Sequence, residues 1–554
     1  MTRFTAVSAI VLATVLALRV SAQDKTPPVP TKTVEARAEL DLPDSITEEE
    51  LKFLGSKSHR QHAAGGFSGP KSHMGEVARH AARERGRVQD RNRYGRFMDQ
   101  AWTVMLCKKG LIPRESAQKV LEALEKTQFG GEGQLKKLLK DEDLASIPVI
   151  GRTLQEPMAR MQLRDKQLDV IDSVHDFLQV LLDSAERHAE TVMPGMTHMA
   201  HSQPTTYGAY LVALHDGVYR GLEHLELAYK HTNENSGGCG ATSGTGWPID
   251  RYMITELLGF NKLVEPTYDG EAGQDYGMNT LFALSNIMIT VSRTAMDHGI
   301  WGMDGYLTHK LPAAHLGVSS LMPQKAHSGS AYERVRISTN NVIGATTIGM
   351  LGLHGEPFGD VLTSYQATYR APNAGAIGAL CETEMTMVIF GDMLATIKVD
   401  KKKLLKLTRE GWGCTPDLQE KLIQEEGYGR RQAWRICAVM VRIARDHRKI
   451  TPPQLTGEML DEAAVVAGEP QPGLSTEEIR EIFDPVKFLE RHDNVGDPNP
   501  KETLRLVEVR RKQLAESRKR QQQRRARVGA GFAKLREEIK AIIGEKATSD
   551  YVKP

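Results

Sequence analysis

Two short clusters of polar residues near the middle of the chain have the residue types needed for acid–base chemistry. The first contains Thr197, His198 and Gln203 and follows Pro194 and Gly195, residues that end helices. We therefore expect a loop here, in which a histidine beside hydroxyl and amide groups is placed for proton transfer. Most such histidines are structural or simply exposed, so this cluster alone leaves both interpretations open.

The second cluster is the run Ser319-Ser320-Leu321-Met322-Pro323-Gln324-Lys325. A serine hydroxyl is a poor base because it must first be ionised, and no His/Asp triad surrounds Ser319 in sequence. Backbone amides and the Lys325 ammonium could stabilise both a serine alkoxide and a substrate carboxylate. The run therefore suits a serine base, although so short a run is also compatible with chance.

A glycine-rich run begins at Gly237 and ends in Pro248-Ile249-Asp250-Arg251. Glycines let backbone amides approach an anion closely. However, we expect no strand before this run, and it lacks the Gly-Lys-Ser/Thr ending of a phosphate-binding loop. Close packing between helices is the alternative interpretation.

Helical periodicity predicts the elements that position these residues. Apolar side chains recur at alternating spacings of three and four over 171–188 and again over 211–225, which predicts two long amphipathic helices. Two more apolar helices are expected near 281–301 and 376–397. Helices this long, apolar on more than one face, need partners, so we expect an all-α bundle completed by other subunits.

Shorter helices are expected before the bundle, where Gly110 follows one helix and Pro113 opens the next. The chain has 554 residues, enough for two or three domains with a large core. Its 72 basic and 70 acidic residues nearly balance, which argues against binding a nucleic acid as the main function. The basic run from Arg518 to Arg525 is interpreted as a solvated helix face, with a nucleic-acid or anionic-lipid patch as the alternative.

The first residues differ from the rest of the chain. A basic start, an apolar run from Ala6 to Leu18 and the small residues Val20-Ser21-Ala22 predict a secretory signal peptide cleaved after Ala22. The apolar run is short for a membrane span, so we expect a periplasmic or secreted protein without stable membrane association. An uncleaved anchor and a wrongly assigned start codon are the alternatives. The five cysteines are odd in number and scattered, which predicts buried free thiols and no zinc site.

Together these motifs resemble those of the fumarase/aspartase superfamily. The sequence Pro323-Gln324-Lys325 within the second cluster is most similar to that of argininosuccinate lyase. The run from Ser319 resembles the signature loop of that superfamily, and the Thr-His and Gln-Pro pairs are in register with argininosuccinate lyases. The glycine-rich run shares the family's Gly-x-Gly-Ala spacing and Pro-Ile-Asp-Arg ending. The likeness extends over about residues 65 to 515. It includes Gly65–Pro70, Met105–Leu121, Thr415–Leu418, Phe483–Pro485 and Asn494–Gly496.

The resemblance implies a three-domain, all-α lyase fold whose central long-helix bundle is completed in a homotetramer. It also implies a role for each matching residue. Ser319 would be the catalytic base, His198 the proton donor to the leaving nitrogen, and Glu333 the partner of His198. Thr197, Gln203, Ser320, Lys325 and Arg251 would bind a small dicarboxylate substrate. No metal and no organic cofactor is implied.

Three departures from the family bear on the substrate and the chemistry. The family's Ser-Arg-Asn-Asp motif has only a weak counterpart at Gly151-Arg152-Thr153, and a stretch that cradles arginine is replaced near 360–366. Both changes argue against argininosuccinate itself as substrate. The family's Asn-Pro after the signature lysine is replaced by Ala326-His327-Ser328, and Glu333 arrives one residue late. We expect a one-residue insertion, with His327 contacting a substrate carboxylate.

The sequence therefore predicts a lyase that eliminates an amine from an N-substituted aspartate and releases fumarate. The alternatives are a C–O lyase or a carboxymuconate-type cycloisomerase of the same superfamily, or a non-catalytic relative. The expected domains are a signal peptide at 1–22, a linker at 23–64, an N-terminal helical domain at 65–155, a central bundle with the catalytic loop at 156–398, a C-terminal helical domain at 399–515 and a basic helical tail at 516–554.

Overall fold

The computed structural model describes residues 92–153, 157–306, 308–312, 315, 321–322, 329–355, 357–358 and 372–544. In these ranges the chain is mainly helical, which confirms the all-α prediction. The predicted signal peptide, the linker and the segment Gly65–Pro70 lie outside the described residues. Within the described part, no helix is both long and apolar enough to cross a membrane.

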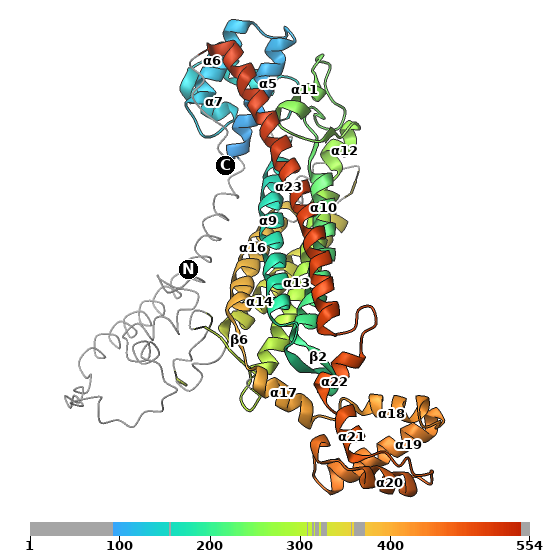
Figure 1. Cartoon of the computed structure of the whole chain (residues 1–554). Coiled ribbons are helices and arrows are strands. Elements are labelled where there is room, and N and C mark those ends of the chain that lie inside the picture. The colour runs from blue at the N-terminus through green and yellow to red at the C-terminus, as the bar shows by residue number, and fades with distance from the viewer. Residues whose placement is uncertain are drawn as a thin grey trace, which may run out of the picture. The chain divides into compact units, whose positions relative to one another are not determined.

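Five long helices form the central bundle (Figure 1). They are α9 (Met158–Arg187), α10 (Tyr207–Thr232), α13 (Asp275–Trp301), α14 (Ser330–His354) and α16 (Pro372–Thr396). The stripes expected on the first two helices are confirmed, because Ile171, Leu178, Leu211 and Leu225 are fully buried. α10 and α13 approach closely where Gly221 faces Ile287, since a Cβ at Gly221 would lie 2.5 Å from Ile287 Cγ1.

A small group of helices precedes the bundle, as expected from Gly110 and Pro113. It consists of α5 (Asn92–Lys108), α6 (Arg114–Glu125), α7 (Glu132–Leu139), α8 (Glu142–Ser146) and the 3-10 turn η2 (Ile147–Val149). Pro113 is the N-cap of α6, and Gly110 has a left-handed φ of 67°, which lets the chain reverse between α5 and α6.

The strands in the described ranges are short and form three two-stranded sheets. β1 (Val192–Thr197) and β2 (Ala200–Thr206) make an antiparallel hairpin between α9 and α10, with a register shift between Pro194 and Met196. β3 (Glu234–Asn235) pairs in parallel with β4 (Lys262–Leu263), and β5 (His309–Lys310) pairs antiparallel with β6 (Lys398–Val399). Two short helices, α11 (Arg251–Leu257) and α12 (Thr267–Ala272), flank β4.

The C-terminal helices have a hydrophobic core of their own, built around Leu418, Ile436, Leu460 and Phe488. The elements are α17 (Lys401–Glu410), α18 (Thr415–Gln424), α19 (Arg430–Val441), the π-helical turn η5 (Arg442–His447), the 3-10 turn η6 (Pro452–Gln454), α20 (Gly457–Val466), α21 (Thr476–Ile482) and α22 (Pro485–Arg491).

The last described helix, α23 (Pro500–Ile543), is 44 residues long and runs back along α9 and α10 to α5 and α6 (Figure 1). The boundary expected between residues 515 and 516 therefore falls inside a single helix. Its residues Val507, Leu514, Gln521, Val528, Leu535 and Ile542, spaced by seven, are all buried. Because this seam packs into the main core, the C-terminal residues up to 543 are part of the fold and not a separate tail.

The basic run on α23 is paired with acidic residues of the bundle. Arg525 contacts Asp169 and Asp172 of α9, and Arg524 Nη1 lies 3.0 Å from Glu226 Oε1 of α10. These ion pairs neutralise much of the positive charge that a polyanion would need. The interpretation of the basic run as a helix face is thus supported. This face of α23 contacts acidic side chains of α9 and α10 as well as solvent.

All five cysteines are free, and the prediction of buried thiols is confirmed for Cys239, Cys381, Cys414 and Cys437, whereas Cys107 is half-buried. Burial raises the pKa of Cys414 and of Cys437 to about 12. These thiols are consequently neutral packing residues at neutral pH. The described residues contain no cluster of His, Cys, Asp and Glu suited to a metal ion.

Candidate active site

Thr197 and His198 lie at the tip of the β1–β2 hairpin. The expectation of a plain loop was wrong, because the chain on both sides of His198 pairs as strands, with Thr197 opposite Ala200. His198 and Met199 form the two-residue turn and both have left-handed backbones, with φ of 53° and 59°. Such a turn normally carries Asn-Gly, and each non-glycine residue in it costs roughly 1 kcal/mol or more.

The strained turn contains an exposed histidine, His198. Thr197, His198 and Gln203 are exposed, and Met199 is 71% exposed, so the turn is not held in place by burial of its own side chains. Strained residues of this kind gather at functional sites, where the surrounding structure holds them. The hairpin therefore presents the His198 imidazole outward from a fixed backbone position.

The support for the hairpin comes from elements on either side of it. α17 packs on β1 and α22 contacts β2. Gly413 approaches β2 so closely that a Cβ there would lie 2.2 Å from the Ser202 carbonyl oxygen. At the base of the hairpin, the Thr206 hydroxyl caps α10 by accepting a hydrogen bond from the Ala209 amide at 3.0 Å. The C-terminal helices α17 and α22 thus pack against the hairpin strands and support them.

The glycine-rich run follows α10 at its other end. The short strand β3 precedes it, contrary to expectation, but β3 pairs only over two residues with β4. Gly238 and Gly240 have φ of 83° and 59°, values that favour glycine. The run packs against Gly151, where a Cβ would lie 3.3 Å from both Thr245 Oγ1 and Trp247 Cβ.

Two arginines considered for substrate contact are engaged in holding backbone. Arg251 donates from Nε to the Gly237 carbonyl at 2.8 Å, and its two Nη atoms donate to the carbonyls of Val264 and Glu265. Its guanidinium thereby fixes the glycine-rich run, and direct substrate contact by Arg251 stays a prediction. Arg152 is buried and is paired with the buried carboxylate of Asp99, so it differs from an exposed arginine that could grip a substrate.

Within one chain these groups lie at opposite ends of the bundle. The hairpin precedes α10 and the glycine-rich run follows it, and α10 has 26 residues. At 1.5 Å per residue this helix separates them by about 39 Å. His198 and Arg251 of the same chain therefore cannot contact one substrate.

Helix α14, which follows the signature run in the sequence, begins at the hairpin end of the bundle. Ser319, Ser320, Lys325 and His327 lie outside the described residues. Glu333 lies in the first turn of α14 and is exposed. Tyr332 beside it packs against His298, with ring centroids 6.2 Å apart, and the Tyr207 hydroxyl at the base of the hairpin lies 2.8 Å from His298 Nε2. His198 and Glu333 thus belong to the same end of the bundle, and a pairing between them stays a prediction.

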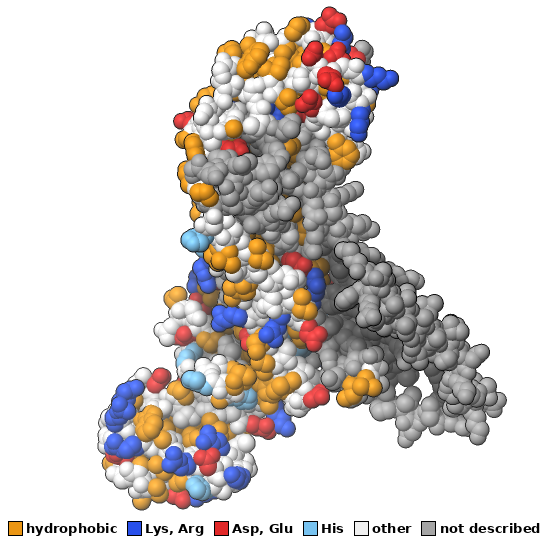
Figure 2. Space-filling view, turned by 180° about the vertical axis from the view of Figure 1, so that it is seen from behind, with side chains coloured by type: hydrophobic (Ala, Val, Ile, Leu, Met, Phe, Trp, Pro, Cys, Tyr) orange, Lys and Arg blue, Asp and Glu red, His pale blue; other side chains and the backbone are white. Residues whose placement is uncertain are grey.

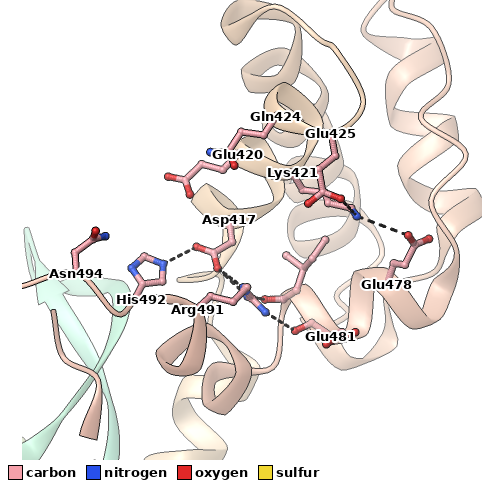
Figure 3. A pocket seen from close by; sticks show the side chains of 11 residues that line it. Asp417, Glu420, Lys421, Gln424, Glu425, Glu478, Glu481, Arg491, His492 and Asn494 are labelled. Carbon is pink, nitrogen blue, oxygen red and sulfur yellow. Dashed lines mark hydrogen bonds and ion pairs between the residues drawn. The ribbon is translucent and has the colours of Figure 1, made fainter. Parts of the chain in front are cut away.

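A pocket of about 490 Å³ lies among the C-terminal helices (Figure 3). Its basic side chains already have carboxylate partners, since Arg491 Nη2 lies 2.7 Å and His492 Nε2 3.0 Å from the Asp417 carboxylate. Lys421 is paired with Glu425 at 2.5 Å. Asp417 belongs to the Thr415–Leu418 segment that resembles the family, and its bonds tie α18 to α22, the helix that contacts β2. We therefore interpret this cluster as structural: it holds α22 in place against strand β2 of the hairpin.

Comparisons with known proteins agree with this architecture. The family model described as Lyase matches residues 156–344. The argininosuccinate lyase of Methanosarcina acetivorans is 30% identical over 431 residues, covering 74% of this chain and 85% of the relative. The argininosuccinate lyase of Methanothrix thermoacetophila is 27% identical, covering 81% of this chain and 93% of the relative.

Solved structures show the same fold. EDDS lyase in complex with formate has a TM-score of 0.76 and 24% identity, covering 84% of this chain and 94% of that chain. Class II fumarase from Schistosoma mansoni has a TM-score of 0.60 and 14% identity, covering 74% and 95%. The 30% identity to the Methanosarcina acetivorans enzyme over most of both chains shows that this chain belongs to the argininosuccinate lyases of the fumarase/aspartase superfamily and is a carbon–nitrogen lyase.

Proposed function

We propose that the protein eliminates an amine from an N-substituted aspartate and releases fumarate. The observation that carries this proposal is the strained, exposed turn that holds His198 next to Thr197 in a carbon–nitrogen lyase. The curated relatives are argininosuccinate lyases, and one solved neighbour is an EDDS lyase variant with bound fumarate. Their chemistry supports a dicarboxylate with a nitrogen substituent as the substrate class.

In the proposed mechanism, Ser319 removes the proton from the carbon next to the distal carboxylate. The electron pair of that C–H bond forms the new double bond, and the C–N bond breaks. His198, oriented by Glu333, supplies the proton that the departing nitrogen takes up. Lys325, Thr197 and nearby backbone amides stabilise the negative charge that gathers on the carboxylate before the C–N bond breaks. Ser320, Gln203 and His327 are proposed to hold the substrate carboxylates.

We further propose that the active site is shared between copies in a homotetramer. The glycine-rich run with Arg251 is proposed to contribute to the substrate site as well, and since about 39 Å of helix α10 separates it from the hairpin in one chain, the contribution would come from a second copy. The bundle also carries an uncovered apolar stripe on α13, formed by Phe282, Ile289 and Met296 at intervals of seven residues and 42–49% exposed. Such stripes are typical of helix–helix interfaces.

Neighbouring α14 extends this apolar surface, with Ile337, Ile348 and Leu351 between 52% and 66% exposed. α13 and α14 pack against each other, so the two sets of side chains belong to adjoining helices. Figure 2, which views the molecule from behind, shows orange hydrophobic side chains gathered along the middle of that face. A helix pair from another copy would bury them.

The surroundings of Arg152 bear on the identity of the amine. In the weak counterpart of the Ser-Arg-Asn-Asp motif, the Arg152 guanidinium is turned to Asp99 and to the carbonyls of Pro148 and Thr153. Because the Arg152 guanidinium is used in these bonds within the protein, its position supports a substrate whose leaving amine is not arginine. EDDS, for which a structural neighbour is named, is therefore a useful test substrate beside argininosuccinate.

The function is tested by running the reaction in reverse. Purified protein is mixed with fumarate and a panel of amines and amino acids, including arginine, and fumarate is followed by its ultraviolet absorbance. We expect consumption with a particular amine and none with Ser319→Ala or His198→Asn. Asparagine keeps the left-handed turn at position 198 and removes only the imidazole. Consumption that persists in Ser319→Ala, or none with any amine, would contradict the proposal and favour C–O lyase or cycloisomerase chemistry.

The shared site is tested by mixing two inactive variants. His198→Asn removes the acid at one end of the bundle, and Arg251→Lys disturbs the glycine-rich run at the other. After unfolding and refolding together, mixed assemblies would contain some sites built only from intact parts, so partial activity should return. Mixtures of either variant with itself serve as controls. If the mixture stays as inactive as the controls while each variant is folded, the site is not shared in this way.

We also propose that residues 1–22 direct export, so that the enzyme acts on an external aminocarboxylate. The proposal rests on the basic start, apolar run and small residues of that segment. N-terminal sequencing of the native protein should begin at Gln23. A cytoplasmic protein with Met1–Ala22 intact would remove the basis for this role.

A further inference from the structure

A buried group of two tyrosines and two histidines lies between the hairpin and the start of α14. We call Tyr207, His298, His309 and Tyr332 the Tyr–His cluster. Their side chains come from four separate elements, namely α10, α13, β5 and α14. All four are at most 7% exposed. Neither the proposed acid–base steps nor the substrate contacts use any of them.

The hydrogen bonds of His298 fix its protonation. Its Nδ1 lies 2.8 Å from the Thr294 carbonyl oxygen, which can only accept, so Nδ1 carries the proton. Burial lowers the pKa of His298 to about 4, so Nε2 is bare at neutral pH. Nε2 therefore accepts a hydrogen bond from the Tyr207 hydroxyl at 2.8 Å. Burial raises the pKa of Tyr207, which keeps this hydroxyl protonated.

Tyr207 connects this bond directly to the hairpin. It is the first residue of α10 and follows Thr206, the last residue of β2. Its amide donates to the Thr191 carbonyl at 2.9 Å, just before β1. Both strands of the hairpin that carries His198 are thus anchored at one residue.

The other half of the cluster lies at the start of α14. The Tyr332 hydroxyl lies 2.7 Å from His309 Nε2, and β6 holds His309 by pairing it with Val399. Gly329, directly before α14, lies flat against the Tyr332 ring, because a Cβ there would lie 2.4 Å from Tyr332 Cε2. The position of this ring therefore sets where α14 begins.

The two halves are in ring contact. The His298 centroid lies 5.9 Å from that of His309 and 6.2 Å from that of Tyr332. In a densely packed interior, a shift of one ring displaces the next. Resting on the proposed function, we propose that Tyr207 and His298 are positioning residues that fix the His198 hairpin relative to the first turn of α14, which carries Glu333.

The test compares two buried tyrosine hydroxyls on the same helix. Tyr207→Phe removes the hydroxyl bonded to His298 and leaves the ring in place. Tyr229→Phe is the matched control, because its hydroxyl is also buried and accepts a hydrogen bond from Asn233 at 3.1 Å, at the far end of α10. Both variants lose one buried hydrogen bond, so they should have similar unfolding midpoints.

With the amine found in the reverse assay, we expect kcat of Tyr207→Phe to fall at least about ten-fold with KM little changed, since small misplacements of reacting groups are costly. Tyr229→Phe should stay within about two-fold of wild type. His298→Gln keeps an acceptor for Tyr207 and should retain more activity than His298→Leu. Equal losses in Tyr207→Phe and Tyr229→Phe, or in the two His298 variants, would overturn the proposal.

Amide hydrogen exchange gives a readout that does not need turnover. Tyr207→Phe should speed exchange both in the hairpin, 192–206, and in the first turn of α14, whereas Tyr229→Phe should affect neither. Exchange that changes in the hairpin alone would refute the link between the two halves. If wild type converts no substrate but the exchange pattern is as expected, the proposed function fails and the positioning link stands.

Discussion

Replacing Ile289 by glutamate should dissociate the proposed tetramer. Ile289 is 42% exposed in the single chain and lies in the middle of the apolar stripe on α13. Full burial of an isoleucine side chain contributes roughly 1.5–3 kcal/mol, so covering the exposed fraction contributes about 1 kcal/mol. A carboxylate in the same covered position adds a desolvation cost of several kcal/mol.

The combined effect is about 4 kcal/mol for each substituted side chain. A symmetric interface carries the substitution at least twice, which gives about 8 kcal/mol and a loss of association by nearly six orders of magnitude, or roughly 10⁶-fold. Light scattering after size-exclusion chromatography should then show a tetramer for wild type and a smaller species for Ile289→Glu. Fumarate-forming activity should be lost with it, because the hairpin and the glycine-rich run no longer meet.

The matched control is Val465→Glu on α20, where an apolar side chain is 59% exposed but lies outside the stripe. It should keep the wild-type mass and activity. An Ile289→Glu protein with unchanged mass and turnover would show that this face is not an interface. A monomeric wild type that is fully active would refute the shared site altogether.

Three further predictions concern stability and the turn. His298 has a pKa of about 4 when folded against an ordinary 6.5, so the unfolded chain binds the proton first. The unfolding free energy should therefore fall as the pH drops below 6.5, by about 2 kcal/mol at pH 5. Urea titrations at pH 7 and 5 check this, and His298→Gln with unchanged acid sensitivity would contradict it. Met199→Gly relieves the left-handed backbone, so stability should rise by up to about 1 kcal/mol while kcat falls several-fold; unchanged kcat would show that the rigid turn is dispensable. Arg525→Glu should lower the unfolding free energy by about 1 kcal/mol, because Arg525 is partly exposed in its contacts with Asp169 and Asp172. High salt should shrink that loss, and a loss independent of salt would point to packing.

The bundle could be predicted from sequence because its signal is repeated many times. Ile171, Val174, Leu178 and Leu181 mark one face of α9, and each further turn strengthens the same inference. The short helices around Gly110 and Pro113 were predictable for a different reason, since those residues have distinct backbone preferences. Both kinds of signal are local to their own helix.

The hairpin was missed because its strands lack such a signal. Pro194 faces Pro204 across the hairpin, and the register shift after Pro194 breaks the alternation that identifies strands. Its turn uses His198 and Met199 where a hairpin normally shows Asn-Gly. The turn therefore departs from the usual sequence rule at the residue proposed for catalysis.

The extent of α23 was missed although a signal was present. The basic run from Arg518 to Arg525 indicates an exposed, charged helix face. The apolar residues Val507, Leu514, Val528 and Leu535, at multiples of seven residues, continue on both sides of that run and mark the buried face of the same helix. A polar residue, Gln521, interrupts that apolar series and is nevertheless buried, where its amide donates to the Leu168 carbonyl at 2.8 Å. The partners of α23 come from distant parts of the chain, so no local pattern could have named them.

The path of α23 has a consequence for how the polypeptide matures. Lys108 of α5 and Glu538 of α23 are paired across 430 residues of sequence, and the Phe97 and Phe532 rings pack 5.1 Å apart. The earliest described helices thus remain without their final partner until α23 has been made. Contacts of such long sequence separation form late and slow folding. A premature stop shortly before Phe532 would consequently leave α5 and α6 exposed to aggregation and degradation, even though the five helices of the bundle had already been made.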